Sequence, residues 1–331
     1  MTTDRVQTIA DIARLAGVSK STVSRALSDS PRIGSETKER IRAIVREHRF
    51  QLNDSARRLS RKQSETVGLV TYPGPATLDP FLLELMTSLL SGLREHGYDL
   101  LVLQANPRDT EWVGRYLESG RVDGFVVLGG TCTQHEIDAL NALDAPFIVW
   151  GTPVSVRGRY SSVSGDNALG GRLATEHLLA SGRTRIGFLG GPAEDPQVQA
   201  RYEGYEAALE SAGIEVDPRL VTYGSWMASD RMRSSLERAP DLDGVFANSD
   251  VLAIAAMQEL QARRRAVPDD VAVVGYDDVA VAALADPPLT TVRQNLPLAG
   301  KLLAENLLAH LHDHATTHVS IPPELVVRAS A

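Results

Sequence analysis

Apolar residues recur at helical spacing in two short stretches near the start of the chain, one on each side of a glycine. The two apolar stripes consist of Ile9, Ile12, Ala13 and Ala16, and of Val23, Ala26 and Leu27. Gly17 gives the backbone freedom that a tight turn needs. Thr8 stands where an N-cap is expected, with Asp11 placed to complete a capping box, and Ser19 is placed to cap the second stretch. The pattern predicts two short helices joined by a tight turn.

The outer face of the second predicted helix is polar and cationic. It carries Lys20, Ser21, Ser24, Arg25 and Ser28. Such a helix can lie in the DNA major groove, where short donors and acceptors meet base edges and an arginine meets a guanine or a phosphate. The alternative is an ordinary helical hairpin with a solvated face. We expect DNA contacts from the following residues of this region: Thr8, Ser19, Lys20, Ser21, Thr22, Ser24 and Arg25.

A third helix is predicted to begin near Gly34 or Ser35, with Ile41, Ile44 and Val45 facing inward. Together the three helices make a compact head, residues 1–52, which is near the lower size limit for an unstapled domain.

The segment 53–63 that follows the head is polar, basic and short. Ala56 and Leu59, with the arginines between them, could form two helical turns, but so short a helix is not stable alone in water. We therefore interpret this segment as a linker that is flexible in the free protein.

From Thr66 onward, short apolar runs alternate with stretches of helical periodicity. The predicted strands are Val67–Val70, Leu100–Leu103, Gly124–Leu128, Phe147–Trp150, Arg185–Leu189, Val245–Ala247 and Val271–Gly275. The helices predicted between them include Leu82–His96, Ala168–Ser181, Gln199–Ala212 and Val251–Arg263. Nearly continuous apolar strands alternating with helices indicate parallel sheets covered on both faces. The strands are too many for one sheet of normal size, so we expect an α/β body of two lobes, with a ligand between them at the carboxyl ends of the strands.

Charge divides the chain at the same place. Residues 1–62 hold 14 Lys and Arg against 7 Asp and Glu, which gives +7, and the rest of the chain carries −15 of the total of −8. A basic head suits a module that displaces counterions from DNA phosphates, and an acidic body discourages DNA from binding elsewhere. The single cysteine, Cys132, the polar start and the lack of a long apolar run favour a soluble cytoplasmic protein without a membrane segment.

Several separated motifs occur along the chain in a fixed order. They are Ala16-Gly17-Val18-Ser19, Thr22-Val23-Ser24-Arg25, Ala56-Arg57-Arg58-Leu59, Asp166-Asn167 with Gly170, Gly190-Gly191-Pro192, Arg201 with Gly204-Tyr205, Ser249-Asp250, Val274-Gly275-Tyr276-Asp277-Asp278 and Pro288-Leu289-Thr290-Thr291. Each motif is weak alone, and their combination is specific. With these motifs in their order and spacing, the chain resembles the lac repressor (LacI/GalR) family of bacterial transcription factors over essentially its whole length.

The resemblance implies that residues 53–63 become a hinge helix only on DNA, paired with the hinge of a second protomer. It makes Leu59 the apolar wedge at a central minor-groove step, with Asn53, Ala56 and Arg57 as further DNA contacts. Lys20 and Ser21 then occupy the positions of variable base readers. The head departs from the family at Leu52, where proline is common, so the start of the hinge is open.

For the body, the resemblance implies a periplasmic-binding-protein-like fold. The amino lobe would hold about residues 64–161 and 293–320, and the carboxyl lobe about 162–292 and 321–331. No heptad extension follows the sequence Leu325-Val-Val-Arg328, so we expect a homodimer.

The resemblance also implies that Arg201 reaches an effector in the cleft between the lobes. A fork formed by Arg201 with Asp277 could clamp two sugar hydroxyls or a carboxylate. Ser249 and Asp250 could add acceptors, although Asp250 could equally cap the next helix. Further cleft candidates are Trp226, Asp79 and Phe81. Together these residues favour a saccharide, with a nucleoside or a sugar phosphate as alternatives.

Other functions fit the sequence less well. No GxSxG elbow, Walker loop or metal-spaced histidine cluster is present, and no GxGxxG has an acidic partner, so we expect no enzyme, no catalytic residues, no cofactor and no metal. A transport binding protein would lack the basic head, and a regulator that answers to a protein partner remains open. The predicted function is a dimeric repressor that binds a pseudo-palindromic operator and releases it when a small molecule closes the cleft.

Overall fold

The computed structural model describes residues 8–48, 63–72, 79–106, 109–130, 133–152, 160–224, 231–313 and 316–331. The chain forms two compact units, one that ends at Ser64 and one that begins at Glu65. The described part of the first unit is helical, and every described strand belongs to the second.

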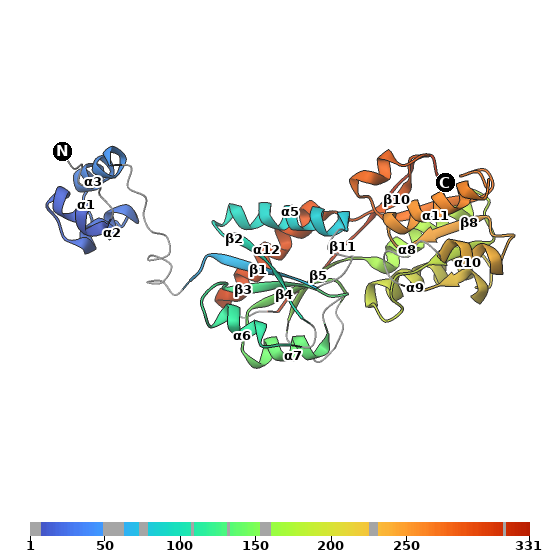
Figure 1. Ribbon diagram of the computed structural model, residues 1–331, viewed down its shortest axis with the longest axis horizontal. Coiled ribbons are helices and arrows are strands. Elements are labelled where there is room, and N and C mark those ends of the chain that lie inside the picture. The colour runs from blue at the N-terminus through green and yellow to red at the C-terminus, as the bar shows by residue number, and fades with distance from the viewer. Residues whose placement is uncertain are drawn as a thin grey trace. The chain divides into compact units, whose positions relative to one another are not determined.

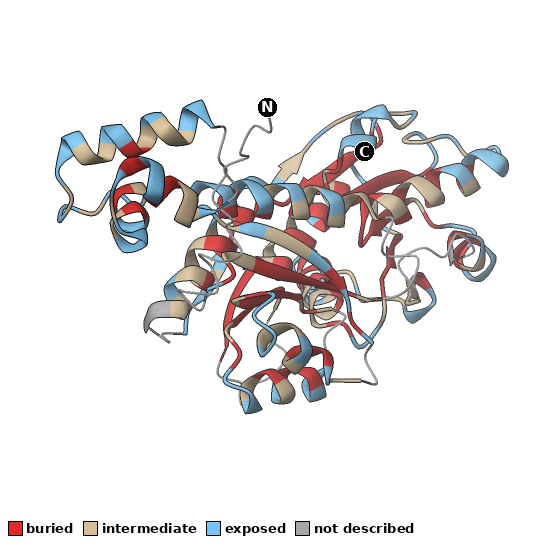
Figure 2. Ribbon diagram, turned by 60° about the vertical axis from the view of Figure 1, so that its left-hand side comes forward, coloured by how far each residue is buried: buried red, intermediate tan, exposed pale blue. Residues whose placement is uncertain are grey.

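The head consists of the three predicted helices, α1 (Ile9–Ala16), α2 (Lys20–Leu27) and α3 (Ser35–Glu47) (Figure 1). Six of the side chains predicted to face inward are buried, and the others are partly buried against them. The buried ones are Ile12, Ala13, Ala16, Val23, Ala26 and Ile41, and the partly buried ones are Ile9, Leu27, Ile44 and Val45. The sides of the helices that face one another are buried and their outer sides are exposed (Figure 2). The structure thus confirms the inward face that the apolar periodicity predicts for each helix.

The predicted helix ends are also present. The backbone N of Asp11 donates to the Thr8 hydroxyl at 3.3 Å, and the backbone N of Thr8 donates to the Asp11 carboxylate at 3.1 Å, which completes a capping box. Gly17 ends α1 in the left-handed conformation with φ 66°. Ser19 caps α2 by accepting from the backbone N of Thr22 at 3.1 Å.

The body contains two sheets of six strands. In the first sheet all neighbouring strands are parallel, in the order β11-β5-β4-β3-β1-β2. These strands are β1 (Thr66–Thr71), β2 (Asp99–Gln104), β3 (Gly124–Leu128), β4 (Phe147–Trp150), β5 (Ser161–Gly165) and β11 (His318–Ile321). Apolar contacts place α5 (Pro80–Glu95) and α12 (Leu296–Asp313) on one face, and α6 (Trp112–Leu117) and α7 (Gln134–Ala142) on the other. We call this layered part the amino lobe.

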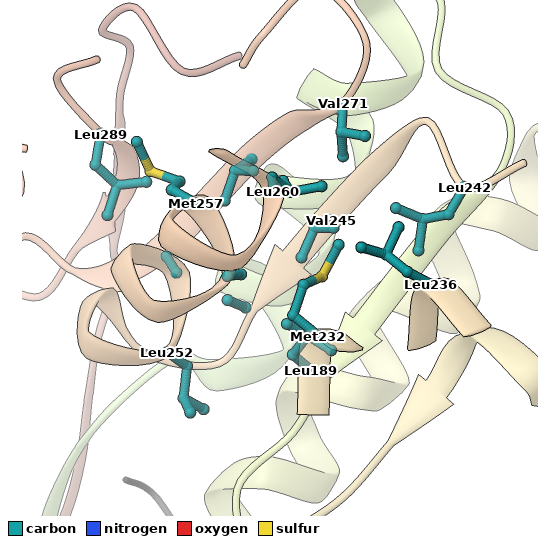
Figure 3. Packing of buried hydrophobic residues seen from close by; sticks show 14 of the residues in the cluster. Leu189, Met232, Leu236, Leu242, Val245, Leu252, Met257, Leu260, Val271 and Leu289 are labelled. Atoms are coloured by element: carbon teal, nitrogen blue, oxygen red, sulfur yellow. The ribbon is translucent and has the colours of Figure 1, made fainter. Parts of the chain in front are cut away.

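The second sheet has the order β12-β10-β9-β8-β6-β7, parallel except that β12 runs antiparallel to β10. Its strands are β6 (Ile186–Leu189), β7 (Val221–Thr222), β8 (Gly244–Ala247), β9 (Ala272–Asp277), β10 (Thr290–Arg293) and β12 (Glu324–Val326). One face is covered by α8 (Asn167–Ala180) and α9 (Pro196–Ser211), and the other by α10 (Arg231–Arg238) and α11 (Asp250–Ala262). We call this part the carboxyl lobe; its α10–α11 core is drawn in Figure 3.

The carboxyl lobe also contains two short 3-10 helices. One, η2 (Pro218–Leu220), directly precedes β7, and the other, η3 (Ala280–Leu284), follows β9. Because helices cover both faces of each sheet, the central strands are buried along almost their whole length (Figure 2). The fold class predicted from the sequence is confirmed: a helix-turn-helix head and a two-lobed α/β body. Among the described helices, none combines the length and the apolar composition needed to cross a membrane.

All seven predicted strands are present, with ends that differ by at most two residues, and five further strands are not apparent from the pattern. The clearest case is β5, with the sequence Ser-Ser-Val-Ser-Gly, which is buried at every position. Its hydroxyls have partners at the start of the neighbouring strand β11: Ser161 Oγ accepts from the backbone N of Thr317 at 3.1 Å, and Ser162 Oγ lies 2.8 Å from His318 Nδ1. Long-range hydrogen bonds therefore stabilise a strand that apolar periodicity alone does not predict.

Candidate functional site

The exposed face of α2 carries the candidate DNA-reading side chains. Lys20, Ser21, Ser24 and Arg25 are exposed, and Thr22 is half-buried. Among the described residues, ion pairs of the head engage Arg14, Lys38, Arg42 and Arg46 and leave Lys20 and Arg25 unpaired. Two cations on one helix face are thus available to a polyanion.

Hydroxyl groups at the start of α2 form a small network. Ser19 Oγ lies 2.8 Å from the hydroxyls of both Ser21 and Thr22, besides capping the helix. The network fixes the first turn, where backbone N–H groups point outward and favour an anion such as a phosphate. Thr8 likewise fixes the first turn of α1, because its hydroxyl lies 2.8 Å from the Asp11 carboxylate. Their DNA contacts remain predictions.

Four candidates for DNA contact in the linker, Asn53, Ala56, Arg57 and Leu59, lie outside the described residues. Trp226, a cleft candidate, does so as well. Their predicted roles stay predictions.

The body brings its polar candidates together at the carboxyl ends of the strands in both lobes. Asp79 is the N-cap of α5 in the amino lobe, and Asp195 is the N-cap of α9 in the carboxyl lobe. Asp277 is the last residue of β9. The lobes approach closely at this edge, since a Cβ added to Gly130, after β3, would lie 2.2 Å from Asp195 Oδ2. We call this edge the cleft.

Arg201 is the centre of the cleft. Its side chain is 3% exposed, its Nε donates to Asn167 Oδ1 at 2.8 Å, and one terminal nitrogen donates to the backbone carbonyl of Asn248 at 2.6 Å. The guanidinium lies 3.6 Å from the ring centroid of Tyr276, which is a cation–π distance. These three contacts hold the guanidinium in one place.

Close packing of α8 against α9 places Arg201 beside Asn167. A Cβ added to Gly171 would lie 2.0 Å from the backbone O of Arg201, and one added to Gly204 would lie 2.0 Å from the backbone O of Ala168. Only glycine permits this approach of the two backbones. The glycines of the two helices are thus part of how the sequence builds the cleft.

Two buried carboxyl groups, Asp195 and Asp277, and the half-buried Asp79 interact with the arginine, and burial raises the pKa of each. The pKa of Asp277 is raised well above its ordinary value by burial, although Arg201 opposes the shift. Burial likewise raises the pKa of Asp79 and Asp195, in both cases against a lowering by Arg201. Because burial penalises the charged form of all three groups, the cleft disfavours a further negative charge.

Four buried polar atoms at the cleft edge have no hydrogen-bond partner among the described residues. They are Asp195 Oδ2, Asn248 Nδ2, Gln294 Oε1 and Trp150 Nε1. An unmade hydrogen bond of a buried group costs about 1–3 kcal/mol, so an arrangement of two acceptors and two donors is typical of a site that is completed by a ligand or water. Trp150 ends β4, and its ring lies 6.2 Å from that of Phe81, which supplies an aromatic wall.

The predicted ligand-clamping fork of Arg201 and Asp277 stays a prediction, but the two side chains do not bond directly to each other. Among the described residues no ion pair joins the two side chains, because the guanidinium is turned toward Asn167 and Asn248 and stacks on Tyr276. The carboxylate of Asp277 instead accepts from Gln294 Nε2 at 2.8 Å. The two groups interact through space, and neither neutralises the other by contact.

Ser249 and Asp250 also have protein partners. Ser249, and not Asp250, caps α11, by accepting from the backbone N of Leu252 at 3.3 Å. Asp250 is fully buried; it accepts from the backbone N of Val279 at 2.8 Å and from the hydroxyl of Thr291. Burial raises its pKa to about 7. Its place beside the Asp277 loop points to support of the cleft rather than to direct contact.

The comparisons with known proteins agree along the whole chain. Residues 8–53 match the model of bacterial regulatory proteins of the lacI family, and residues 175–331 match that of the periplasmic binding protein-like domain. The transcriptional regulator CelR of Thermobifida fusca is 35% identical over 335 residues, which cover 98% of both chains. This chain belongs to the lacI family of bacterial regulatory proteins. It is therefore a DNA-binding transcriptional regulator.

Other relatives of this lacI-family regulator support the same reading. The ribose operon repressor of Escherichia coli K12 is 31% identical and is matched over 98% of this chain and 99% of its own. The solved CelR–cellobiose complex has a TM-score of 0.77 with 33% identity and coverage of 98% and 99%. The lac repressor dimer bound to operator and the anti-inducer ONPF has a TM-score of 0.85 with 25% identity and 98% coverage of both chains.

Sequence reasoning missed four residues of the regulator's cleft, namely Trp150, Asp195, Asn248 and Gln294. Two signals were available: Asp195 precedes Pro196 at a helix start, and Trp150 ends a predicted buried strand. In the described parts of the chain, no three His, Cys, Asp or Glu side chains are grouped so that they could hold a metal ion.

Proposed function

We propose that this regulator is a homodimeric repressor that binds a pseudo-palindromic operator in the cytoplasm and releases it when a neutral saccharide fills the cleft. The observation that carries the proposal is the buried Arg201, fixed by three contacts and surrounded by carboxyl groups from both lobes. A ligand at this point touches both lobes at once, so its binding energy can change their relative position.

The chemistry of the cleft favours a sugar. A sugar hydroxyl donates and accepts, which suits the acceptors Asp195 Oδ2 and Gln294 Oε1 and the donors Asn248 Nδ2 and Trp150 Nε1. The Phe81 and Trp150 rings can stack against the apolar face of a pyranose. The burial that raises the pKa of the carboxyl groups also disfavours the charged group of a sugar phosphate. CelR is solved with cellobiose, and a lacI-family regulator of Enterococcus faecium, 26% identical, is solved with ribose; both support a saccharide here.

For DNA, we propose that Lys20, Ser21 and Arg25 read bases in the major groove. The hinge at 53–63 would fold on the duplex, with Leu59 as a wedge in the minor groove. The charge of +7 on residues 1–62 supports strong attraction to phosphates.

A surface on the body supports the homodimer. Leu83 and Leu90, one heptad apart on α5, are exposed, as are Val281 and Leu284 in η3; Leu284 is 82% exposed. The backbone N of Ala280 donates to Glu84 Oε1 at 3.0 Å, which joins the two lobes between these apolar groups. An exposed apolar strip of this kind is typical of a subunit interface. Because the strip crosses both lobes, their movement would change the spacing of the two hinges.

A thermal-shift screen tests the cleft. Cellobiose, D-ribose, D-glucose, glucose 6-phosphate and adenosine are each added to the wild type and to Arg201→Lys. We expect a neutral sugar to raise the melting temperature of the wild type only, and the same sugar to lower its affinity for an operator selected from random duplexes. We also expect the sugar to be recovered chemically unchanged.

Other outcomes of the screen would change the proposal. A shift with glucose 6-phosphate or adenosine alone would contradict the neutral saccharide while retaining the cleft. A sugar that shifts Arg201→Lys as much as the wild type would contradict the assignment of the cleft. No shift with any of them would favour a protein partner as the signal.

A further inference from the structure

The backbone adopts two unusual conformations in succession, at the last residue of β9 and at the residue after it. Asp277 has φ 112° and Asp278 has φ 58°, values that residues with a side chain rarely adopt. Two such residues in succession persist only where their surroundings hold them, and such positions cluster at functional sites. The first of the two, Asp277, is the carboxyl group that interacts with Arg201 and, across the cleft, with Asp79.

Asp278 is held by two arginines. Its carboxylate is 6% exposed and accepts from Arg328 at 2.5 Å and from Arg293 Nε at 2.7 Å. Arg328 also donates through its other terminal nitrogen to the backbone carbonyl of Leu289 at 2.7 Å. Its own backbone N donates to the hydroxyl of Thr290 at 2.9 Å. Arg328 thus ties the segment after β12 both to the start of β10 and to the turn after β9.

The two arginines differ in their surroundings. The side chain of Arg328 is 20% exposed, whereas that of Arg293 is 47% exposed and its second partner, Glu324, is 76% exposed. A charge pair in contact with solvent contributes little, while a hydrogen-bonded charge pair that is sheltered from solvent is stronger. Arg328 is therefore the dominant partner of Asp278.

The residues on either side of Asp278 are held as well. Gln294 donates to the Asp277 carboxylate at 2.8 Å, and the backbone N of Val279 donates to Asp250 at 2.8 Å. Three successive residues are thus tied to three different parts of the carboxyl lobe. Without the central tie, the backbone of Asp277 and Asp278 can relax toward ordinary values of φ and turn the Asp277 carboxylate away from Arg201.

We propose that Arg328 is a positioning residue for the ligand: through Asp278 it holds the strained turn that aims the Asp277 carboxylate into the cleft. The proposal rests on the proposed function in one respect, namely that Asp277 contacts the ligand. By this proposal, Arg328 contributes to ligand affinity although it lies outside the cleft, in the segment after β12.

Calorimetric titration with cellobiose, and with D-ribose as second sugar, tests the proposal on the full-length protein. Arg328→Gln is expected to weaken binding by about tenfold or more, since a hydrogen-bonded charge pair is lost. Arg328→Lys, which retains the charge and loses the fork, is expected to lie between it and the wild type. Arg293→Gln, which removes the more solvated partner of the same carboxylate, is expected to change affinity by less than about threefold.

A fourth variant controls for loss of stability. Arg265 donates to the backbone carbonyls of Pro240 and Leu242 at 3.1 and 2.9 Å, beyond the end of α11 that lies away from the cleft. Arg265→Gln removes an arginine of similar bonding, and we expect it to lower the melting temperature without weakening sugar binding. Equal losses of affinity in Arg265→Gln and Arg328→Gln would overturn the proposal.

Hydrogen exchange separates this proposal from the proposed function. In the free protein, Arg328→Gln is expected to speed exchange of the amides of 277–279 by about tenfold, with no change in β8. If the wild type binds neither sugar, the saccharide assignment fails and exchange alone decides the role of Arg328. Unchanged exchange at 277–279 contradicts the positioning role whether or not a sugar binds.

Discussion

The outer face of α2 and the cleft around Arg201 are built in opposite ways. On α2 the candidate side chains follow one another in the sequence, are exposed, and include two unpaired cations among the described residues. In the cleft, Asp79, Asp195, Arg201 and Asp277 come from both lobes and are largely buried. An exposed charged face acts at long range and is screened by salt, whereas a buried site acts through short hydrogen bonds for which water does not compete.

The largest expected difference between the two sites is in how strongly salt weakens the binding of their ligands. Between about 50 and about 200 mM salt, operator affinity is expected to fall by about a thousandfold or more if six or more phosphates are neutralised. Affinity for the cleft sugar is expected to change by less than about twofold, because a neutral ligand displaces no counterions. Fluorescence anisotropy of labelled DNA and calorimetry of the sugar measure the two. A steep salt dependence of sugar binding would mean that the ligand is charged.

Replacement of Arg201 should break the cleft and spare the head. Arg201→Lys loses the planar stack on Tyr276 and the bond to Asn167, and sugar affinity is expected to fall by about a hundredfold. Operator affinity without sugar is expected to stay within about twofold, since the head is a separate compact unit.

Arg172→Lys is the matched control for this variant. Arg172 lies on α8, is exposed, and pairs with Glu176 at 3.6 Å. We expect it to bind both sugar and operator as the wild type does. A loss of operator affinity in Arg201→Lys but not in Arg172→Lys would show that the two sites are coupled in the absence of ligand.

The same contrast explains what the sequence could predict. In the head, the stripe of Ile12, Val23 and Ala26 and the caps Thr8 and Ser19 are local features, and each is present as predicted. The fold of the body was also predictable, because strands covered on both faces read as apolar runs.

The cleft was only partly predictable, because its geometry depends on contacts between distant residues. The stacking of Arg201 on Tyr276 and the hydrogen bond from the backbone N of Val279 to the buried Asp250 each join residues that are far apart in the sequence. The motifs in the sequence could identify Arg201 and Asp277 as candidate ligand-binding residues. They could not show that Gln294, rather than Arg201, donates a hydrogen bond to the Asp277 carboxylate. Nor could it find β5, whose serines are stabilised by partners near residue 317.

A substitution in the hinge is expected to have an intermediate effect on operator affinity, and it tests whether the head alone recognises the operator. Leu59→Ala removes the proposed wedge, and specific operator affinity is expected to fall by about tenfold, because the kinked duplex is no longer stabilised. Non-specific affinity, which depends on phosphate contacts, is expected to change by less than about twofold. Anisotropy titrations with the operator and with a scrambled duplex at one salt concentration measure both. Equal losses on the two duplexes would contradict the wedge.

The smallest expected effect is a difference in the sign of pH dependence between a buried carboxyl group of the body and an exposed one of the head. Burial raises the pKa of Asp250 from its ordinary value of 3.8 to about 7, so the folded state binds its proton more tightly than the unfolded state does. Its contribution to stability is therefore present below the ordinary value and lost as pH rises through about 7. Asp29, whose pKa is lowered by its bond with Lys38, contributes stability above its ordinary value and loses it as pH falls.

Chemical denaturation of the whole chain from about pH 4 to about pH 8 can measure both effects against matched variants. The difference in unfolding free energy between wild type and Asp250→Asn is expected to fall as pH rises, and that between wild type and Asp29→Asn to stay level over this range. A level difference for Asp250→Asn would mean that the buried carboxyl group is ionised throughout. The contacts from Val279 and Thr291 would then stabilise its charge more strongly than burial disfavours it.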